Sequence, residues 1–208
     1  GERMALQSEP LSPTKTPQSQ PRHAACTRLS CIMGMRGPTS TSETACSSSL
    51  VACGVAQTTL RRRLPGQAKL AISAQLQHGL VLGSNLLLGF QGYVALSGPQ
   101  MLAQEGRCLT FDVSADGYAR GEGVGGAQLR ACESEAESMN RRAVLLGAAI
   151  NQDGRSASLT APNGPSQAAL CRDAMKMARM QPVEVTAAEC HGTGTALGDP
   201  IEIGALQN

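Results

Sequence analysis

The chain has 208 residues, a formal net charge of +2, two Phe, two Tyr and no Trp. So small a charge and so few aromatic rings argue against a nucleic-acid surface, which needs basic grooves and stacking side chains. No apolar run reaches the ~18 residues of a membrane-spanning helix, so we expect no membrane span.

Eight cysteines are scattered along the chain without a CxxC pair or regular spacing, and no secretory signal precedes them. This pattern is typical of reduced thiols inside the cell, and we expect a cytoplasmic protein. The Ser-rich start resembles a transit peptide for a plastid, but Glu2 and Glu9 leave that alternative unsupported.

Residues 1–23 are rich in Ser, Thr, Pro and Gln, which predicts a disordered or linker tail, and a folded domain is expected over residues 24–208. A helix is expected to end between Arg28 and Gly37. The further predicted helices are 46–64, 95–104, 166–180 and 200–206, and the predicted strands are 39–45, 70–72, 80–88, 122–130, 143–150 and 183–190. Residues 107–120 are predicted to form a polar loop. Alternating strands and helices indicate an α/β protein with a mainly parallel sheet.

The first chemically informative stretch surrounds Cys46, in the run Thr44-Ala45-Cys46-Ser47-Ser48-Ser49. Ser and Thr favour helix starts, so Cys46 is expected where a buried helix begins. The positive end of a helix lowers the pKa of a cysteine and favours the nucleophilic thiolate. From these residues alone, a small buried hydrophobic cysteine is an equally good interpretation.

The second informative stretch is His191-Gly192-Thr193-Gly194-Thr195, which lies after a predicted strand and before a helix. Ligand sites of α/β proteins lie at such positions, so His191 is a candidate catalytic residue and pairs chemically with a cysteine. A Gly-rich turn with a surface histidine is the alternative. Cys190 has no partner at metal-ligand spacing, so no metal is expected. Asp199 and Glu202 are expected to cap and charge the final helix rather than to form a catalytic pair.

The two stretches resemble the signature motifs of β-ketoacyl synthases, in particular the ketosynthase domains of polyketide synthases. Further segments match that family in the same order from about Ala24 onward: residues 35–38, 107–112, 115–123, 151–156 and 159–164.

The resemblance implies a thiolase-like layered αβαβα sandwich, truncated before the end of its second half. It also implies acyl transfer to Cys46, followed by decarboxylative condensation with a malonyl-type extender. His191 would stabilise the developing enolate, and Thr193 and Thr195 would contact the pantetheine arm. No cofactor would bind directly, since the substrates ride on the phosphopantetheine of an acyl carrier protein. Other polyketide synthase domains are implied partners, and a full-length chain would form a homodimer.

Several features depart from the family pattern. The family's second catalytic histidine lies in a Lys-Ser-Asn-x-Gly-His motif downstream of Asn208, and His23 and His78 match no motif. Glu43 replaces the usual Asp, and Gln67 to His78 resembles an insertion. A catalytically incomplete fragment or interaction module is therefore the alternative function, and fatty-acid elongation is an alternative to polyketide synthesis.

Overall fold

The computed structural model describes residues 23–61, 76–131, 141–158 and 160–208. The chain divides into two units, residues 1–43 and 44–208, each of which is described by itself. The predicted tail, the strand at 70–72 and most of the insertion ending at His78 lie outside the described residues.

The first unit contains helix α1 (His23–Ile32), which ends within the predicted range. Gly34 has a φ of +64°, which glycine adopts without strain, and the turn is closed by the Met35 N–H donating to Ser30 O. The expected strand at 39–45 is wrong, since residues 38–44 form no β-ladder in the described chain.

The second unit opens with a 3₁₀ helix, η2 (Ala45–Ser47), that leads directly into helix α2 (Ser48–Arg61). The helix forms as predicted, because most of its residues are small or apolar and it contains no proline. It is not buried all round, however. Its buried residues are Gly54, Gln57 and Leu60, whereas the Leu50 side chain is 74% exposed.

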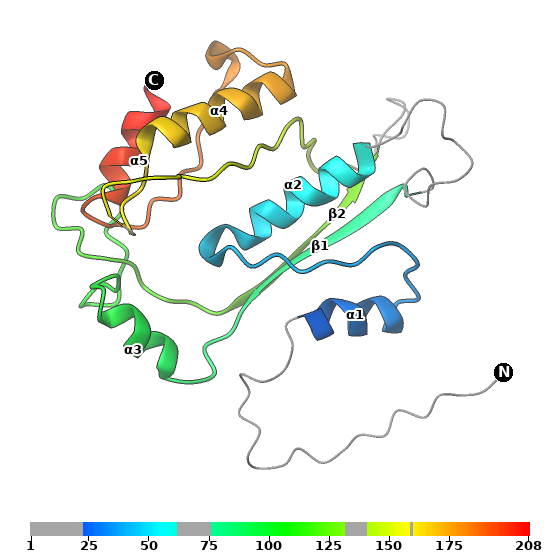
Figure 1. Ribbon diagram of the computed structural model, residues 1–208, viewed down its shortest axis with the longest axis horizontal. Helices are drawn as coiled ribbons and strands as arrows, with labels where there is room; N and C mark the ends of the chain where they lie inside the picture. Colours follow the sequence, from blue (N-terminus) through cyan, green and yellow to red (C-terminus); the bar gives the residue numbers. More distant parts are fainter. Residues whose placement is uncertain (1–22, 62–75, 132–140, 159) are drawn as a thin grey trace. The chain divides into compact units, whose positions relative to one another are not determined.

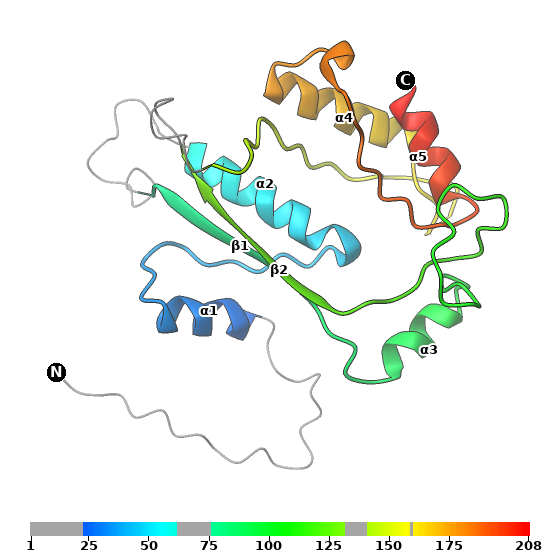
Figure 2. The same cartoon turned by 180° about the vertical axis from the view of Figure 1, so that it is seen from behind.

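Helix α2 lies against a two-stranded sheet formed by β1 (His78–Asn85) and β2 (Gly123–Arg130) (Figures 1 and 2). The strands are antiparallel, with a register that runs from His78 opposite Arg130 to Asn85 opposite Gly123. Alternate residues of β1 face the helix: Val81 is buried, and a Cβ at Gly83 would lie 3.0 Å from Cβ of Ser49. Glycine therefore allows the helix to approach the strand closely.

The prediction of a mainly parallel sheet is wrong for the described residues, whose only sheet is this antiparallel pair. Residues 143–150 and 183–190 also form no ladder; the latter contains part of a short 3₁₀ helix, η5 (Pro182–Glu184). An apolar run becomes a strand only when a second strand accepts and donates its backbone hydrogen bonds, and the described chain offers none here.

Helix α3 (Gln91–Ser97) overlaps the predicted helix 95–104 only over residues 95–97, and the rest of that prediction is wrong because residues 98–104 are not helical. The polar loop 107–120 is confirmed, with a single isolated β-bridge from Leu102 to Tyr118. Arg120 lies over the ring of Tyr93, 5.1 Å from its centroid, and this contact connects the loop to α3.

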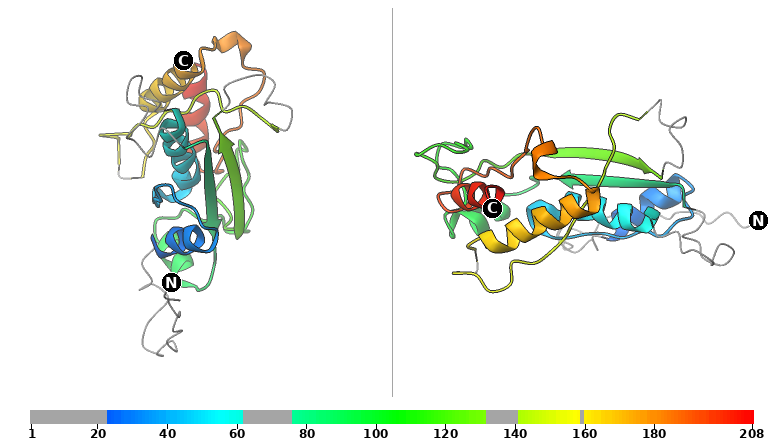
Figure 3. Two further views of the ribbon diagram at one scale, coloured as in Figure 1. Left: turned by 90° about the vertical axis from the view of Figure 1, so that its right-hand side faces the viewer. Right: turned by 90° about the horizontal axis from the view of Figure 1, so that it is seen from above.

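The last two helices, α4 (Gly164–Ala178) and α5 (Gly198–Leu206), match the predicted helices closely and pack on each other (Figure 3). Asn163 caps α4 by accepting the Ser166 N–H at 3.2 Å, and its own amide donates to Asp153 O. Arg179 ends the helix in the left-handed region, with a φ of 56°.

Few large apolar side chains are buried in the described residues, where Leu60, Val81, Ala168 and Ala205 form the apolar core. No helix in the described ranges is long and apolar enough to cross a membrane.

Replacing Asn163 by Ala should lower the free energy of unfolding by about 1–2 kcal/mol, because α4 loses its cap. Chemical denaturation followed by circular dichroism measures this change. Gln167→Ala, in the first turn of the same helix, is the matched control and should have a smaller effect. Equal stabilities of the two variants would contradict the capping role.

Candidate active site

Cys46 lies in a strained turn directly ahead of α2. Ala45, the preceding residue, has a φ of +53°, which an L-residue other than Gly adopts only at a cost. The turn is held by hydroxyl groups: Ser47 Oγ donates to Thr44 O at 2.9 Å, and Ser48 Oγ accepts the Thr44 N–H at 2.8 Å and donates to Ala45 O at 2.7 Å. The exposed Cys46 thiol is thereby fixed at a helix start, where the dipole favours negative charge.

His191 belongs to an irregular loop whose backbone is bound by Glu202 of α5. The His191 N–H donates to Glu202 Oε1 at 2.6 Å, and the Gly192 N–H donates to Glu202 Oε2 at 2.9 Å. Gly192 and Gly194 have φ values of +53° and +70°, so the loop needs glycine at both positions. The imidazole itself is exposed and free to meet a ligand.

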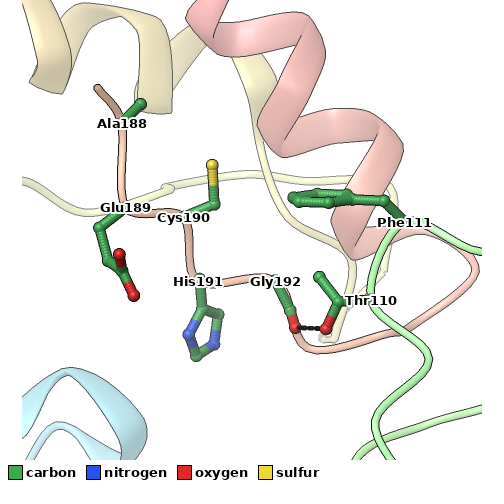
Figure 4. Close-up of a pocket in the computed structure, with 7 residues that line it drawn as sticks. All are labelled: Thr110, Phe111, Ala188, Glu189, Cys190, His191 and Gly192. Carbon is green, nitrogen blue, oxygen red and sulfur yellow. Dashed lines mark hydrogen bonds between the residues drawn. The ribbon is translucent and has the colours of Figure 1, made fainter. Parts of the chain in front are cut away.

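Asp199 connects this loop to a second one. Its side chain is only 4% exposed, and its two oxygens accept the Gly194 N–H at 3.0 Å and the Phe111 N–H at 2.8 Å. The Thr110 hydroxyl donates to Gly192 O at 2.6 Å (Figure 4). Hydrogen bonds to a charged acceptor are stronger than neutral ones, so the carboxylates fix the loop firmly.

This arrangement corrects the sequence prediction for Asp199 and Glu202. Asp199 does lie in the first turn of α5, as predicted, but neither carboxylate caps the helix. The Gly198 N–H instead donates to the Thr195 hydroxyl at 3.1 Å. Sequence reasoning missed the true role of the carboxylates. The available signal was a pair of acids, one helical turn apart, after a Gly-Thr-Gly loop.

Thr193 and Thr195 lie in the same loop, with their hydroxyl oxygens 3.1 Å apart and both half-buried. One hydroxyl thus bonds the other while Thr195 also accepts the N–H of the first residue of α5. Contact of these groups with a pantetheine arm stays a prediction.

An open pocket of about 400 Å³ lies beside the His191 loop (Figure 4). It is lined by Thr110, Phe111, Ala188, Glu189, Cys190, His191 and Gly192.

Cys190 lines this pocket but is a poor nucleophile. Partial burial raises the pKa of its thiol, and the carboxylates of Glu202, Glu189 and Asp199 raise it further. Its sulfur points away from the imidazole of His191 (Figure 4). The thiol therefore stays protonated at neutral pH.

The structure places Cys46 and His191 on separate elements, ahead of α2 and ahead of α5. Cys46 does not line the pocket, and no hydrogen bond joins the two residues in the described structure. Cys53 is half-buried, and His78 is exposed, with its ring Nδ1 3.2 Å from Gln128 Nε2. Within the ranges the structure covers, no three His, Cys, Asp or Glu side chains gather as metal ligands do.

Comparison with known families gives two adjoining matches. Residues 4–136 match the β-ketoacyl synthase N-terminal domain, and residues 142–208 match the β-ketoacyl synthase C-terminal domain.

Curated relatives are polyketide synthases. A phenolphthiocerol/phthiocerol polyketide synthase from Mycobacterium tuberculosis is 44% identical over 191 residues, which are 91% of this chain and 8% of the relative. The highly reducing polyketide synthase phiA of a fungal species is 42% identical over 180 residues, 86% of this chain and 7% of that protein. The chain thus spans less than a tenth of these relatives.

The solved structures that resemble this chain are also ketosynthases. The ketosynthase from module 6 of the bacillaene synthase of Bacillus subtilis is 34% identical, with a TM-score of 0.74 over 88% of this chain and 31% of its own. An oxazolomycin ketosynthase domain of Streptomyces albus is 31% identical, with a TM-score of 0.80 over 91% of this chain and 32% of its own.

The fold is thus the thiolase-like α/β fold of ketosynthases, represented over about a third of such a domain's length. The family models match nearly the whole chain, and the relatives are polyketide synthases. The protein therefore belongs to the β-ketoacyl synthase family, as part of a polyketide synthase ketosynthase domain.

Proposed function

We propose that the chain supplies the nucleophile and one histidine of a ketosynthase reaction in polyketide synthesis. The observation that carries the proposal is the turn at Cys46, where a left-handed Ala45 and three hydroxyl hydrogen bonds present an exposed thiol at the start of α2.

The reaction has two stages. The Cys46 thiolate attacks the carbonyl carbon of an acyl thioester, and the carrier's pantetheine thiolate leaves, so that the acyl group is held on sulfur. A malonyl-type thioester then loses carbon dioxide, and its carbanion attacks the Cys46 thioester. A carbon–carbon bond forms, the carbon–sulfur bond breaks and the Cys46 thiolate is regenerated.

His191 is the candidate for the second stage. Its imidazole N–H donates a hydrogen bond to the extender's thioester oxygen as enolate charge develops there. Support comes from Glu202, which accepts the backbone N–H groups on both sides of the His191 α-carbon while the ring is exposed.

The partners follow from the same proposal. An acyl carrier protein delivers both substrates on phosphopantetheine, Thr193 and Thr195 contact that arm, and other polyketide synthase domains act before and after. A homodimer of the full-length protein and a cytoplasmic location also belong to the proposal.

A catalytically incomplete fragment is the second candidate. It is favoured by the many large apolar side chains that stay exposed in the described chain, such as Leu88 at 78% and Phe90 at 72%. Apolar surface of this extent is typical of a segment that packs on further protein.

We expect Cys46, in a chain extended to a full ketosynthase domain, to be acylated by an acyl thioester, and Cys46→Ala to abolish the adduct. Peptide mapping by mass spectrometry locates the acyl group. Cys108→Ala, which removes another exposed cysteine, should retain it. Absence of an adduct on the Cys46 peptide would sink the assignment.

Condensation by the 208-residue chain alone separates the two candidates. If the purified chain joins acyl and malonyl thioesters unaided, as judged by the released β-keto product, the fragment hypothesis is wrong. If it is inactive while the extended domain works, the fragment hypothesis holds for this chain.

The electrostatic effect of Glu202 on the Cys190 thiol can be tested by thiol labelling. Glu202→Gln removes a negative charge near Cys190, so the pKa of that thiol should fall and its alkylation should shift to lower pH. The rate of iodoacetamide labelling of the Cys190 peptide against pH measures the shift. Glu105→Gln, in an exposed turn, is the control and should leave the profile unchanged. An unshifted Glu202→Gln profile would contradict the electrostatic role.

A further inference from the structure

We propose that Gln57 and Arg61 are positioning residues, which bind the segment 145–150 to α2, the helix that directly follows Cys46, and thereby fix Cys46 relative to His191. The catalytic meaning of this geometry rests on the proposed function. The contacts of Gln57 and Arg61 with the segment do not depend on the proposed function.

Both side chains bind consecutive backbone carbonyls. Gln57 Nε2 donates to Leu145 O at 2.8 Å, and Arg61 Nη2 donates to Leu146 O at 2.7 Å. The two residues are four apart in α2 and so lie on one face of the helix. Residues 143–150 have no ladder partner in the described chain, and these two donors bind two of the backbone carbonyls that a neighbouring strand would otherwise bind.

The same helix face makes room for the segment. A Cβ at Gly54 would lie 3.1 Å from Ile150 Cδ1 and 3.6 Å from Ala148 Cβ. Gly54 therefore lets 148–150 lie directly on the helix, one turn before Gln57.

The other side of the segment lies against α4, as the path between the two helices in Figures 1 and 2 shows. A Cβ at Gly147 would lie 2.6 Å from Ala174 O and 2.9 Å from Ala178 N. These are backbone atoms of a helix, which cannot move aside as a flexible side chain can. Glycine is required for this approach, and the segment is a close-fitting spacer between α2 and α4.

The contacts continue from α4 to His191. A Cβ at Gly164, the first residue of α4, would lie 3.5 Å from Ile201 Cγ2 of α5. The next residue of α5 is Glu202, which binds the backbone of His191 and Gly192. An unbroken series of packed elements thus connects the helix that follows Cys46 to the loop that carries His191.

Packing alone does not explain the residue at position 57. Its side chain is only 6% exposed, and its Oε1 is a buried acceptor without a donor among the described residues. An apolar side chain would avoid that cost but could not bind Leu145 O. The amide is therefore suited to holding the segment rather than to filling space.

The test uses the 208-residue chain with a nitroxide label on Cys46, its other cysteines replaced by Ala or Ser. Paramagnetic broadening of the His191 ring resonance reports its distance from Cys46. His78 is the internal reference, because β1 packs directly on α2 and its position does not depend on the segment.

We expect Gln57→Leu with Arg61→Met to reduce the His191 broadening by about half or more, since coupling of this kind shifts a two-state equilibrium severalfold. His78 broadening should not change. Arg61→Lys, which keeps a donor, should restore part of the effect. Thr59→Ala is the matched control, because the Thr59 hydroxyl binds Val55 O within α2 itself.

Gly147→Ala is an independent variant, which displaces α4 while leaving both carbonyl contacts possible, and it should also reduce the His191 broadening. Unchanged broadening in the folded Gln57/Arg61 and Gly147 variants, or an equal loss at His78, would overturn the proposal. Failure of the extended domain to acylate Cys46 would overturn the proposed function but leave this geometric result standing.

Discussion

The site depends on two carboxylates of α5 that accept hydrogen bonds from backbone N–H groups of an otherwise irregular loop. Glu202 accepts the N–H groups of His191 and Gly192, one on each side of the His191 α-carbon, and Asp199 accepts those of Gly194 and Phe111. A loop with two left-handed glycines has many alternative conformations and a large entropy to lose on ordering. Three charge-assisted hydrogen bonds from one short helix bind this loop, and a fourth binds Phe111 of the neighbouring loop, so α5 determines where the His191 backbone lies.

The sequence predicts helices α2, α4 and α5 and the two paired strands well. It fails for α3, which lies earlier than predicted, and for apolar runs that have no strand to pair with. Helices α2, α4 and α5 follow from the local spacing of small and apolar residues. Strands β1 and β2 follow from short apolar runs rich in glycine. Residues 143–150 carry an equally apolar run, but their partners are Gln57 and Arg61 side chains rather than a strand. A ladder is a property of two segments, and one segment's composition cannot report it.

The candidate site shows the same division. Cys46 and His191 were predicted because short motifs surround them, and the structure adds the hydroxyl bonds that hold the Cys46 turn. The tasks of Asp199 and Glu202 could not be predicted, since the sequence does not tell which backbone N–H a carboxylate will meet. The contact of Gln57 could not be predicted for a related reason, because the sequence around this polar residue does not indicate which distant carbonyl it binds.

The left-handed conformation of Ala45, the residue before the nucleophile, limits which substitutions this stretch of sequence can tolerate. Position 45 needs a residue that tolerates a φ near +53°, which disfavours β-branched side chains most strongly. Glycine would relieve the strain but would also free the turn to adopt other conformations. Ser47 and Ser48 each hold the turn through a side-chain hydroxyl bonded to the Thr44 backbone, so loss of either hydroxyl removes a hydrogen bond from the turn. Mutational tolerance should therefore be lowest over these few residues and should rise sharply beyond the first turn of the helix.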